Sequence, residues 1–358
     1  NVNKTMKKHI IASDASLLEA LDRLNGLSGG AMTLFVTEPD GKMAGTLTDG
    51  DIRRALLGGA SLDSAAADAA MRGFRFVTEG TIDAGALRRY RSEGIVLIPV
   101  LDGSGHLKGV LDLSRQRSCL PLKAVLMAGG KGERLRPLTE HTPKPLLQIE
   151  GKAIIDYNVE ALAACGITDI SVTTRYLAEQ IERHFEKPVG GVMVKCVCED
   201  SPCGTIGAVA LTDAASDPDG NTLVMNSDLL TTISFEDFYL HHRDSGADIT
   251  VAVVPYQVSV PFAILALDPE KPDFVSGIEE KPSYSYYANA GIYIFSNKIL
   301  QQLVPGKRCD ATDLISDALK QGARCAYFPI KGTWIDVGSH VDFRQAAELM
   351  RHHNSFNS

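Results

Sequence analysis

The stretch 126–147, which reads LMAGGKGERLRPLTEHTPKPLL, constrains the fold more than any other part of the chain. Its first residues end a short apolar run, LKAVLM, that is typical of a buried strand. Three glycines follow within four residues, namely Gly129, Gly130 and Gly132. Glycine lets successive backbone N–H groups point into one concavity, which forms a nest for an anion. The sequence therefore predicts a strand that ends in an anion-binding loop.

Basic residues follow the glycines, and one of them is held stiffly by its neighbours. Lys131, Arg134 and Arg136 come directly after the glycine cluster, and Lys144 lies between two prolines. Proline fixes its own φ and restricts the residue before it, so the backbone of Lys144 has little entropy left to lose. Arginine suits fork-like contact with a phosphate, whereas lysine acts as a point charge. We therefore expect Arg134 and Lys144 to hold phosphates.

Two common phosphate-binding loops do not fit this stretch. A Walker loop needs Gly-Lys after its spacer, and Gly132 is followed by Glu133; a dinucleotide fingerprint needs a third glycine where Leu135 stands. The whole stretch instead resembles the G-G-x-G-x-R-L-x-P-L-T-x-x-x-P-K-P-L motif of the sugar nucleotidyltransferases. That resemblance implies that Ala128 and the three glycines bind a nucleotide.

Downstream, apolar runs of strand length alternate with amphipathic runs of helix length. Strands are expected at 169–174, 192–198 and 222–227, and helices at 153–167, 177–185 and 205–215. This alternation indicates an α/β fold with a doubly wound, mostly parallel, Rossmann-like sheet whose ligands bind at the carboxyl ends of the strands. Closer-spaced apolar runs at 249–255, 262–268, 273–282 and 289–296 predict added antiparallel strands that frame a second, sugar-facing half.

Two aspartates are candidates for a metal site. Asp228 follows an apolar strand in NSDLL, and Asp336 lies far away in sequence in GTWIDVGS. Taken alone, either residue would more often belong to a turn or a helix cap. The resemblance implies that both bind the metal, and Mg²⁺ in nucleotide sites commonly takes only one or two protein carboxylates. We therefore expect Mg²⁺ as the cofactor.

A second lysine held before a proline suggests where the acceptor binds. Lys281 precedes a proline in IEEKP, the family's Glu-Lys-Pro element, and without other motifs it would be a solvated charged turn. The resemblance implies that Glu280 contacts sugar hydroxyls, Lys281 the sugar phosphate, and Asn289 the sugar. The chain departs from the family at Ala263, where glycine is frequent, so that sugar contact could be displaced.

The loop EDSPCGTIGA matches the family's base-binding element. It begins at Glu199 and includes Gly204 and Thr205, which the resemblance assigns to nucleotide binding. Guanine offers two adjacent donors that one carboxylate accepts, whereas uracil and thymine offer one N–H beside acceptors. Glu199 therefore favours GTP, although it could instead cap the helix expected after it.

These residues lead to one functional hypothesis with two alternatives. The hypothesis is transfer of a nucleotidyl group from an NTP, with GTP favoured, to a hexose or aminohexose 1-phosphate, which yields an NDP-sugar and pyrophosphate. The attacking phosphate is already anionic, so positioning and charge neutralisation by Arg134, Lys144, Lys281 and the metal would suffice. The alternatives are a uridylyl- or thymidylyltransferase of the same fold, and an inert nucleotide-sensing protein. The identity of the sugar stays open.

The first 118 residues contain an internal repeat. Residues 35–54 match a segment that begins at Pro99, at a spacing of 64, and each copy is typical of strand, turn, strand and helix. The pair resembles tandem CBS domains, an α+β module, and Thr48 and Asp51 fit that family's nucleotide-binding pattern. The second copy departs from it at Asp112 and Arg115. We expect an adenine or guanine nucleotide near Thr48 and Asp51, or else a purely structural, dimerising module.

This organisation divides the chain into a regulatory domain, 1–118, and a catalytic domain, 119–358. Seven scattered cysteines argue against a disulfide framework, and Cys196, Cys198 and Cys203 fit buried thiols better than a zinc site. No apolar run reaches the roughly 20 residues that span a bilayer, and no signal peptide or basic tract is present. We therefore expect a cytoplasmic homo-oligomer, at least a dimer, with no nucleic-acid or membrane partner.

Overall fold

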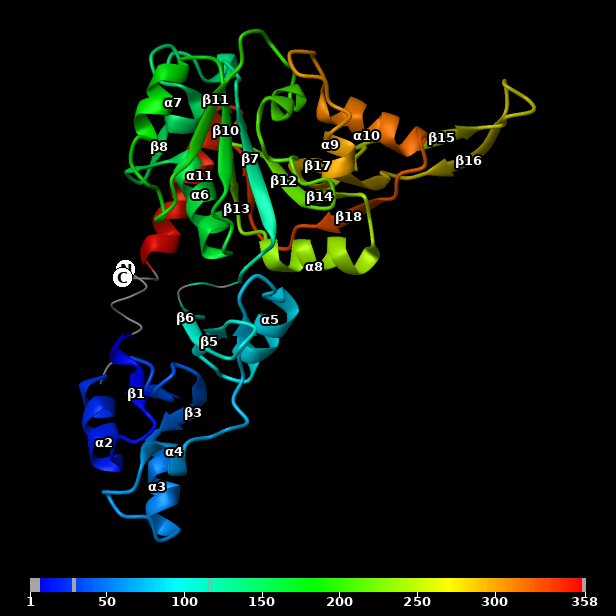
Figure 1. Ribbon diagram of the computed structural model, residues 1–358. Coiled ribbons are helices and arrows are strands. Elements are labelled where there is room, and N and C mark those ends of the chain that lie inside the picture. Colours follow the sequence, from blue (N-terminus) through cyan, green and yellow to red (C-terminus); the bar gives the residue numbers. More distant parts are fainter. Residues whose placement is uncertain (1–6, 28–29, 115, 117, 356–358) are drawn as a thin grey trace. The chain divides into compact units, whose positions relative to one another are not determined.

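The computed structural model describes residues 7–27, 30–114, 116 and 118–355, which form two compact units (Figure 1). The first unit comprises Asn1–Leu120 and Ala164–Gly166, and the second comprises Pro121–Ala163 and Ile167–Ser358. Within the described ranges, none of the helices combines the length and the apolar character needed to cross a membrane.

The first unit is built from two copies of one small fold. Its first sheet has the order β1-β2-β3, with strands Ile10–Ala12, Thr33–Thr37 and Met43–Thr48. Its second sheet has the order β4-β5-β6, with strands Val77–Thr78, Leu97–Leu101 and Leu107–Asp112. The helices are α2 (Leu17–Gly26), α3 (Asp49–Leu57), α4 (Ala66–Ala69) and α5 (Ala84–Ser92). Val36 pairs with Gly45, and Val100 pairs with Gly109, so the sequence repeat is also a repeat of register.

The two copies join at equivalent turns. Lys42 forms a β-bridge with His106, its counterpart in the second copy, and the Met43 N–H donates to the Gly105 carbonyl at 3.0 Å. The Leu107 N–H donates to the Gly41 carbonyl at 3.2 Å, which is the same contact with the two copies exchanged. The two copies therefore contact each other through equivalent residues at this bridge.

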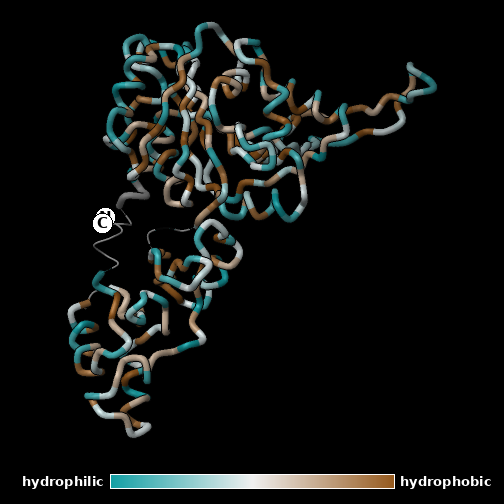
Figure 2. Tube along the Cα trace, viewed as in Figure 1, coloured by the Kyte–Doolittle hydropathy of each residue, from teal (hydrophilic) through white to brown (hydrophobic). Residues whose placement is uncertain are grey.

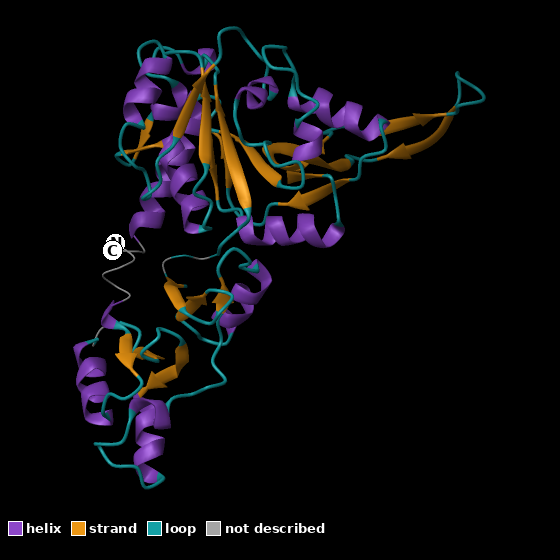
Figure 3. Cartoon of the chain, viewed as in Figure 1, coloured by secondary structure: helices purple, strands orange, loops and turns teal. Residues whose placement is uncertain are grey.

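The second unit contains a seven-stranded sheet of order β11-β10-β7-β12-β17-β14-β18. In that order the strands are Lys195–Cys198, Ile170–Thr174, Leu122–Ala128, Asn221–Asn226, Ser283–Ser296, Ile249–Ser259 and Cys325–Pro329. Every neighbouring pair is parallel except the two pairs that include β17. This confirms the mostly parallel sheet. Helices lie on both sides of it (Figure 3), which explains why β10 is buried at every position.

Shorter elements complete this unit. Its helices are α6 (Ile154–Ala164), α7 (Ala178–His184), α8 (Phe235–Ser245), α9 (Asn297–Leu300), α10 (Ala311–Lys320) and α11 (His340–Ser355). Two-stranded sheets pair β8 (Gln148–Ile149) with β9 (Lys152–Ala153), and β13 (Leu229–Thr231) with β19 (Trp334–Asp336). Short 3₁₀ turns are η1 (Glu133–Leu135), η2 (Lys144–Leu146) and η3 (Gly207–Leu211).

The helix expected at 205–215 is wrong, because only the short turn η3 forms there. The N–H groups of Ile206 and Gly207 both donate to the Cys309 carbonyl, each at 3.1 Å, instead of beginning a helix. A Cβ on Gly207 would lie only 2.6 Å from the Lys307 carbonyl oxygen. The segment is therefore shaped by close packing on a neighbouring loop, which its amphipathic pattern does not reveal.

The antiparallel strands expected late in the chain do form. Beyond the sheet, β14 and β17 continue as a two-stranded ribbon, and β15 (Ile264–Leu267) pairs antiparallel with β16 (Val275–Glu279). Together they project from the sheet (Figure 1), and apolar residues lie along the projecting part (Figure 2). Phe262 and Ile278 are 72% and 71% exposed. This projection, which we call the β-arm, consists of residues 254–288.

A buried histidine in the second unit makes a test of this packing possible. His242 of α8 contacts the Thr250 hydroxyl through Nδ1 at 2.8 Å and the Asn221 Oδ1 through Nε2 at 3.1 Å. Burial lowers the pKa of His242 from 6.5 to about 4. Between these values the unfolded chain binds a proton that the folded chain does not, so stability falls as the pH is lowered through that window.

We therefore expect His242→Gln to flatten the decline of the thermal midpoint between pH 6.5 and 4. At neutral pH the variant should be less stable than the wild type, because it loses two buried contacts. The measurement is calorimetric unfolding at a series of pH values. His141→Gln, at an exposed position, should keep the wild-type slope. Equal slopes for wild type and His242→Gln would contradict the expectation.

Candidate active site

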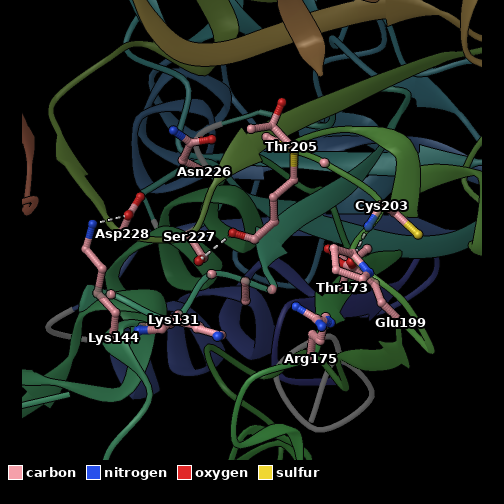
Figure 4. A pocket seen from close by; sticks show the side chains of 18 of the residues that line it. Lys131, Lys144, Thr173, Arg175, Glu199, Cys203, Thr205, Asn226, Ser227 and Asp228 are labelled. Carbon is pink, nitrogen blue, oxygen red and sulfur yellow. Dashed lines mark hydrogen bonds and ion pairs between the residues drawn. The ribbon is translucent and has the colours of Figure 1, made fainter. Parts of the chain in front are cut away.

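A cavity of about 650 Å³ opens at the carboxyl ends of β7, β10, β11 and β12, where a doubly wound sheet places its ligands (Figure 4). It is lined by Met127, Ala128, Gly129, Gly130, Lys131, Gly132, Glu133, Arg134, Lys144, Pro145, Thr173, Arg175, Glu199, Pro202, Cys203, Gly204, Thr205, Asn226, Ser227, Asp228, Arg308 and Gly338. Every residue that the sequence assigned to the nucleotide lines it.

The glycine loop has its shape because side chains pack against it where a Cβ would lie. Gly132 has a φ of +63°, and a Cβ there would lie 3.0 Å from Thr139 Cγ2. The Thr139 hydroxyl donates to the Gly132 carbonyl at 2.7 Å. A Cβ on Gly129 would lie 2.5 Å from Glu199 Oε1, so a side chain there would displace the carboxylate, whereas the positive φ of Gly132 favours glycine outright.

Lys144 and Asp228 line one edge of the cavity, and Asp336, which is not among the lining residues, lies next to Lys144. The Lys144 ammonium forms an ion pair with Asp228 and lies 3.5 Å from Asp336 Oδ1. Lys144 is only 9% exposed. The strands β13 and β19 pair antiparallel, with Leu229 opposite Asp336, and this ladder brings the two remote carboxylates together.

The position of Asp228 is fixed by buried hydrogen bonds on both sides of it. The Ser227 N–H and hydroxyl donate to the Met127 carbonyl at 3.2 and 2.7 Å. The amide of Asn158, a buried residue of α6, donates to the carbonyls of Ser227 and Leu229 at 3.3 and 2.9 Å. Nothing in the sequence around Asn158 distinguishes it from an ordinary helix residue, so sequence reasoning missed it.

The electrostatics of this edge suit a divalent cation. Burial and the nearby charge of Asp228 raise the pKa of Asp336, and Lys144 partly opposes this shift. Asp228 Oδ1 is buried and has no hydrogen-bond partner among the described residues. Carboxylate oxygens are hard ligands that Mg²⁺ accepts. The described residues contain no cluster of three or more His, Cys, Asp and Glu side chains, so this edge offers two carboxylates and not a full cage.

The loop after β11 is fixed by hydrogen bonds around Glu199. The Cys203 N–H donates to Glu199 Oε2 at 3.1 Å, so the carboxylate closes its own loop and caps no α-helix. The Thr205 N–H donates to Asp310 Oδ1 at 2.9 Å. Gly204 has a φ of +77°, and a Cβ there would lie 2.5 Å from a backbone carbonyl. Burial and the charge of Glu199 raise the pKa of the Cys203 thiol, which argues against a reactive cysteine.

Three arginines line the cavity, and the sequence predicted only Arg134. Its Nη2 lies 3.0 Å from the point where a Cβ on Gly338 would be, in the loop after β19. Arg175 directly follows β10, and Arg308 precedes α10 and pairs with Asp310 at 3.3 Å. Arg175 follows an apolar strand, as Asp228 does, and this position could have identified it as a candidate cavity residue. Arg308 carried no comparable signal.

The residues expected to bind the acceptor are not among those that line the cavity. Glu280 and Lys281 are exposed in the turn between β16 and β17, and Lys281 has a φ of +45°. The Asn289 amide donates to the Tyr293 hydroxyl at 3.0 Å, and its Oδ1 accepts from the Gly291 N–H at 2.9 Å. Their roles stay predictions.

In the first unit, Thr48 and Asp51 bind each other. Thr48 caps α3, and the Asp51 carboxylate accepts from the Thr48 N–H at 2.9 Å and from its hydroxyl at 2.6 Å. The Arg54 guanidinium pairs with the same carboxylate. In the second copy, Asp112 accepts from the Ser114 N–H at 3.0 Å, and Arg115 lies outside the described residues. Nucleotide binding here stays a prediction.

Comparison with known proteins gives concordant matches. The family model described as nucleotidyl transferase matches residues 123–353, and the CBS domain model matches residues 5–58. Mannose-1-phosphate guanyltransferases of Neurospora crassa and Schizosaccharomyces pombe are 30% and 31% identical over 228 residues, which is 62% of this chain and 62% of each relative. The chain thus spans less than two thirds of the length of these relatives.

A solved structure from Bacillus anthracis, provisionally named a glucose-1-phosphate thymidylyltransferase and crystallised with sucrose, aligns with a TM-score of 0.51 and 27% identity. The alignment covers 64% of this chain and 95% of that one. Because the family model covers well over half of the sequence and the cavity residues fall within it, the chain belongs to the nucleotidyl transferase family and carries a CBS domain at its N-terminus.

Proposed function

We propose that the protein transfers GMP from GTP to a hexose 1-phosphate and releases pyrophosphate. The observation that carries this proposal is the convergence of Lys144, Asp228 and Asp336 beside the glycine loop. Two relatives are named mannose-1-phosphate guanyltransferases, so mannose 1-phosphate is the first acceptor to test. An inert nucleotide sensor would not need to retain all three groups in one place.

In this proposal the backbone N–H groups of Gly129, Gly130 and Gly132 bind the triphosphate, and Arg134 neutralises part of its charge. An oxygen of the sugar phosphate attacks the α-phosphorus in line, and the bond between that phosphorus and the pyrophosphate oxygen breaks. Pyrophosphate leaves with the bonding electrons. No residue need act as a base, because the attacking oxygen is already anionic near neutral pH.

Members of this family generally use a divalent metal ion. We propose Mg²⁺, held by Asp228 and Asp336, because the buried Asp228 Oδ1 lacks a partner among the described residues. When bound, the ion would neutralise negative charge that gathers on the phosphates. Lys144 already keeps the two carboxylates close, so it would hold these ligands in place before the substrates bind.

The remaining assignments follow from the same proposal. We propose that Glu199, Gly204 and Thr205 bind the base, and that Glu280, Lys281 and Asn289 bind the acceptor. Thr48 and Asp51 would bind a regulatory nucleotide in a homo-oligomer of at least two chains. Because NTPs and sugar phosphates are cytoplasmic metabolites, we propose a cytoplasmic location. A thymidylyl- or uridylyltransferase remains the rival, and the name given to the B. anthracis structure favours the thymidylyltransferase.

Asp228→Asn should reduce pyrophosphate release from GTP and mannose 1-phosphate by at least about a hundredfold, because the loss removes a charged ligand worth several kcal/mol. The thermal midpoint should stay close to that of the wild type, since the amide preserves the side-chain shape. Asp244→Asn, at a side chain 64% exposed on α8, serves as the matched control and should keep full activity. Undiminished turnover in Asp228→Asn would refute the assigned site.

A substrate screen should separate the proposal from its rivals. We expect GTP to exceed UTP and dTTP by at least about tenfold in kcat/KM, because a carboxylate at position 199 accepts two guanine donors but only one from uracil or thymine. The measurement is pyrophosphate release with each NTP in turn, against mannose, glucose and glucosamine 1-phosphates. Preference for dTTP or UTP would favour the rival enzymes, and release with none of the pairs would favour the inert sensor.

A further inference from the structure

Three residues with very different side chains stand next to one another where three parallel strands end. Thr174 pairs with Ala128 of β7 on one side and with Cys198 of β11 on the other. The residues that follow, Gly129, Arg175 and Glu199, therefore form the next row across the sheet. All three line the cavity.

The side chains of this row meet above its glycine. A Cβ on Gly129 would lie 2.5 Å from Glu199 Oε1 and 3.7 Å from Arg175 Cβ. The carboxylate therefore extends across the row toward β7 and lies close to the stem of Arg175. Figure 4 shows Arg175 and Glu199 on the same wall of the cavity. The missing Cβ of Gly129 leaves the space that the Glu199 carboxylate occupies.

Among the cavity's cations in the described ranges, Arg175 shares with Lys131 and Arg134 the lack of an internal anion partner, and it is the one beside Glu199. Lys144 pairs with Asp228, and Arg308 pairs with Asp310. No hydrogen bond or ion pair joins the Arg175 guanidinium to any residue in the described ranges. Its charge nevertheless reaches this wall, since it opposes the rise in the pKa of the Cys203 thiol that Glu199 promotes. A guanidinium aimed at a ligand would show this combination.

On the basis of the proposed function, we infer that Arg175 is a base-specificity residue that acts with Glu199 to select guanine. Glu199 accepts from guanine N1–H and the exocyclic amine, while Arg175 donates to O6 and N7 of the same base. N1 and O6 are adjacent on the guanine edge, so a neighbouring acid and base match its neighbouring donors and acceptors.

The same pair rejects the other bases by reversed polarity. Adenine presents an N1 acceptor to Glu199 and an amine donor in place of O6, so the contact with Glu199 becomes repulsive and Arg175 keeps only N7. Uracil and thymine supply one N–H to Glu199, but their O2 faces its second oxygen. A site that hydrogen-bonds a base in this way discriminates strongly, because the wrong base leaves buried polar groups unpaired.

The test is calorimetric titration of the full chain with GTP, ITP, ATP and UTP, with Mg²⁺ and without acceptor. We expect Arg175→Gln to weaken GTP and ITP binding by about tenfold or more, the range of one lost bidentate contact. ATP and UTP binding should change far less, so the ratio of GTP to ATP affinity should collapse. The preference for GTP over ITP depends on the exocyclic amine, so it should survive Arg175→Gln and disappear in Glu199→Gln.

Lys131→Gln supplies the matched reference, since Lys131 is an exposed cation of the same cavity on the glycine loop. Its loss should weaken all four nucleotides by one common factor, the pattern of a phosphate contact. If Arg175→Gln gives that pattern, Arg175 holds the triphosphate and the inference is wrong; unchanged binding overturns it as well. Wild-type protein that binds no NTP refutes the proposed function itself, and the inference with it. Unfolding midpoints of all variants should match the wild type.

Discussion

The ion pairs between Lys144 and the carboxylates of Asp228 and Asp336 hold the second unit together beside its cavity. They join three segments that the sequence separates widely. Lys144 is nearly buried, so removing both acids would leave its charge uncompensated, whereas after loss of one acid the other carboxylate still faces the ammonium. The glycine loop, the β13–β19 ladder and the Asn158 hydrogen bonds all meet at this contact.

That contact also explains why the site can be assembled before a ligand arrives. Two like charges close together would repel, and the raised pKa of Asp336 records that repulsion together with burial. The internal lysine reduces it enough for the two aspartates to stay together. In the proposed site a divalent cation would have to compete with this ammonium group for the carboxylates.

Local chemistry made much of this predictable from the sequence. The glycines and Lys144 lie in one continuous motif, and Glu199 begins a second one. Both motifs follow strands, and this position predicts that their residues line a cavity. Asn158 was not predictable, because its amide matters only after folding brings it to the carbonyls beside Asp228. The prediction of a helix at 205–215 was wrong for a similar reason, because N–H groups of this segment donate to a carbonyl of a neighbouring loop.

The two copies in the first unit share a register but not an equal core. The larger cluster comprises Ile11, Leu17, Ala20, Leu24, Leu34, Val36, Leu47, Ile52 and Ala66, whereas the smaller comprises Val77, Leu87, Ile98 and Leu113. Because burial of apolar surface dominates folding, the copies differ in how far each can sustain itself. We therefore expect the second copy, with the smaller core, to depend for its stability on the β-bridge between Lys42 and His106. Local unfolding would begin in the second copy and include the first copy only when the first copy also unfolds.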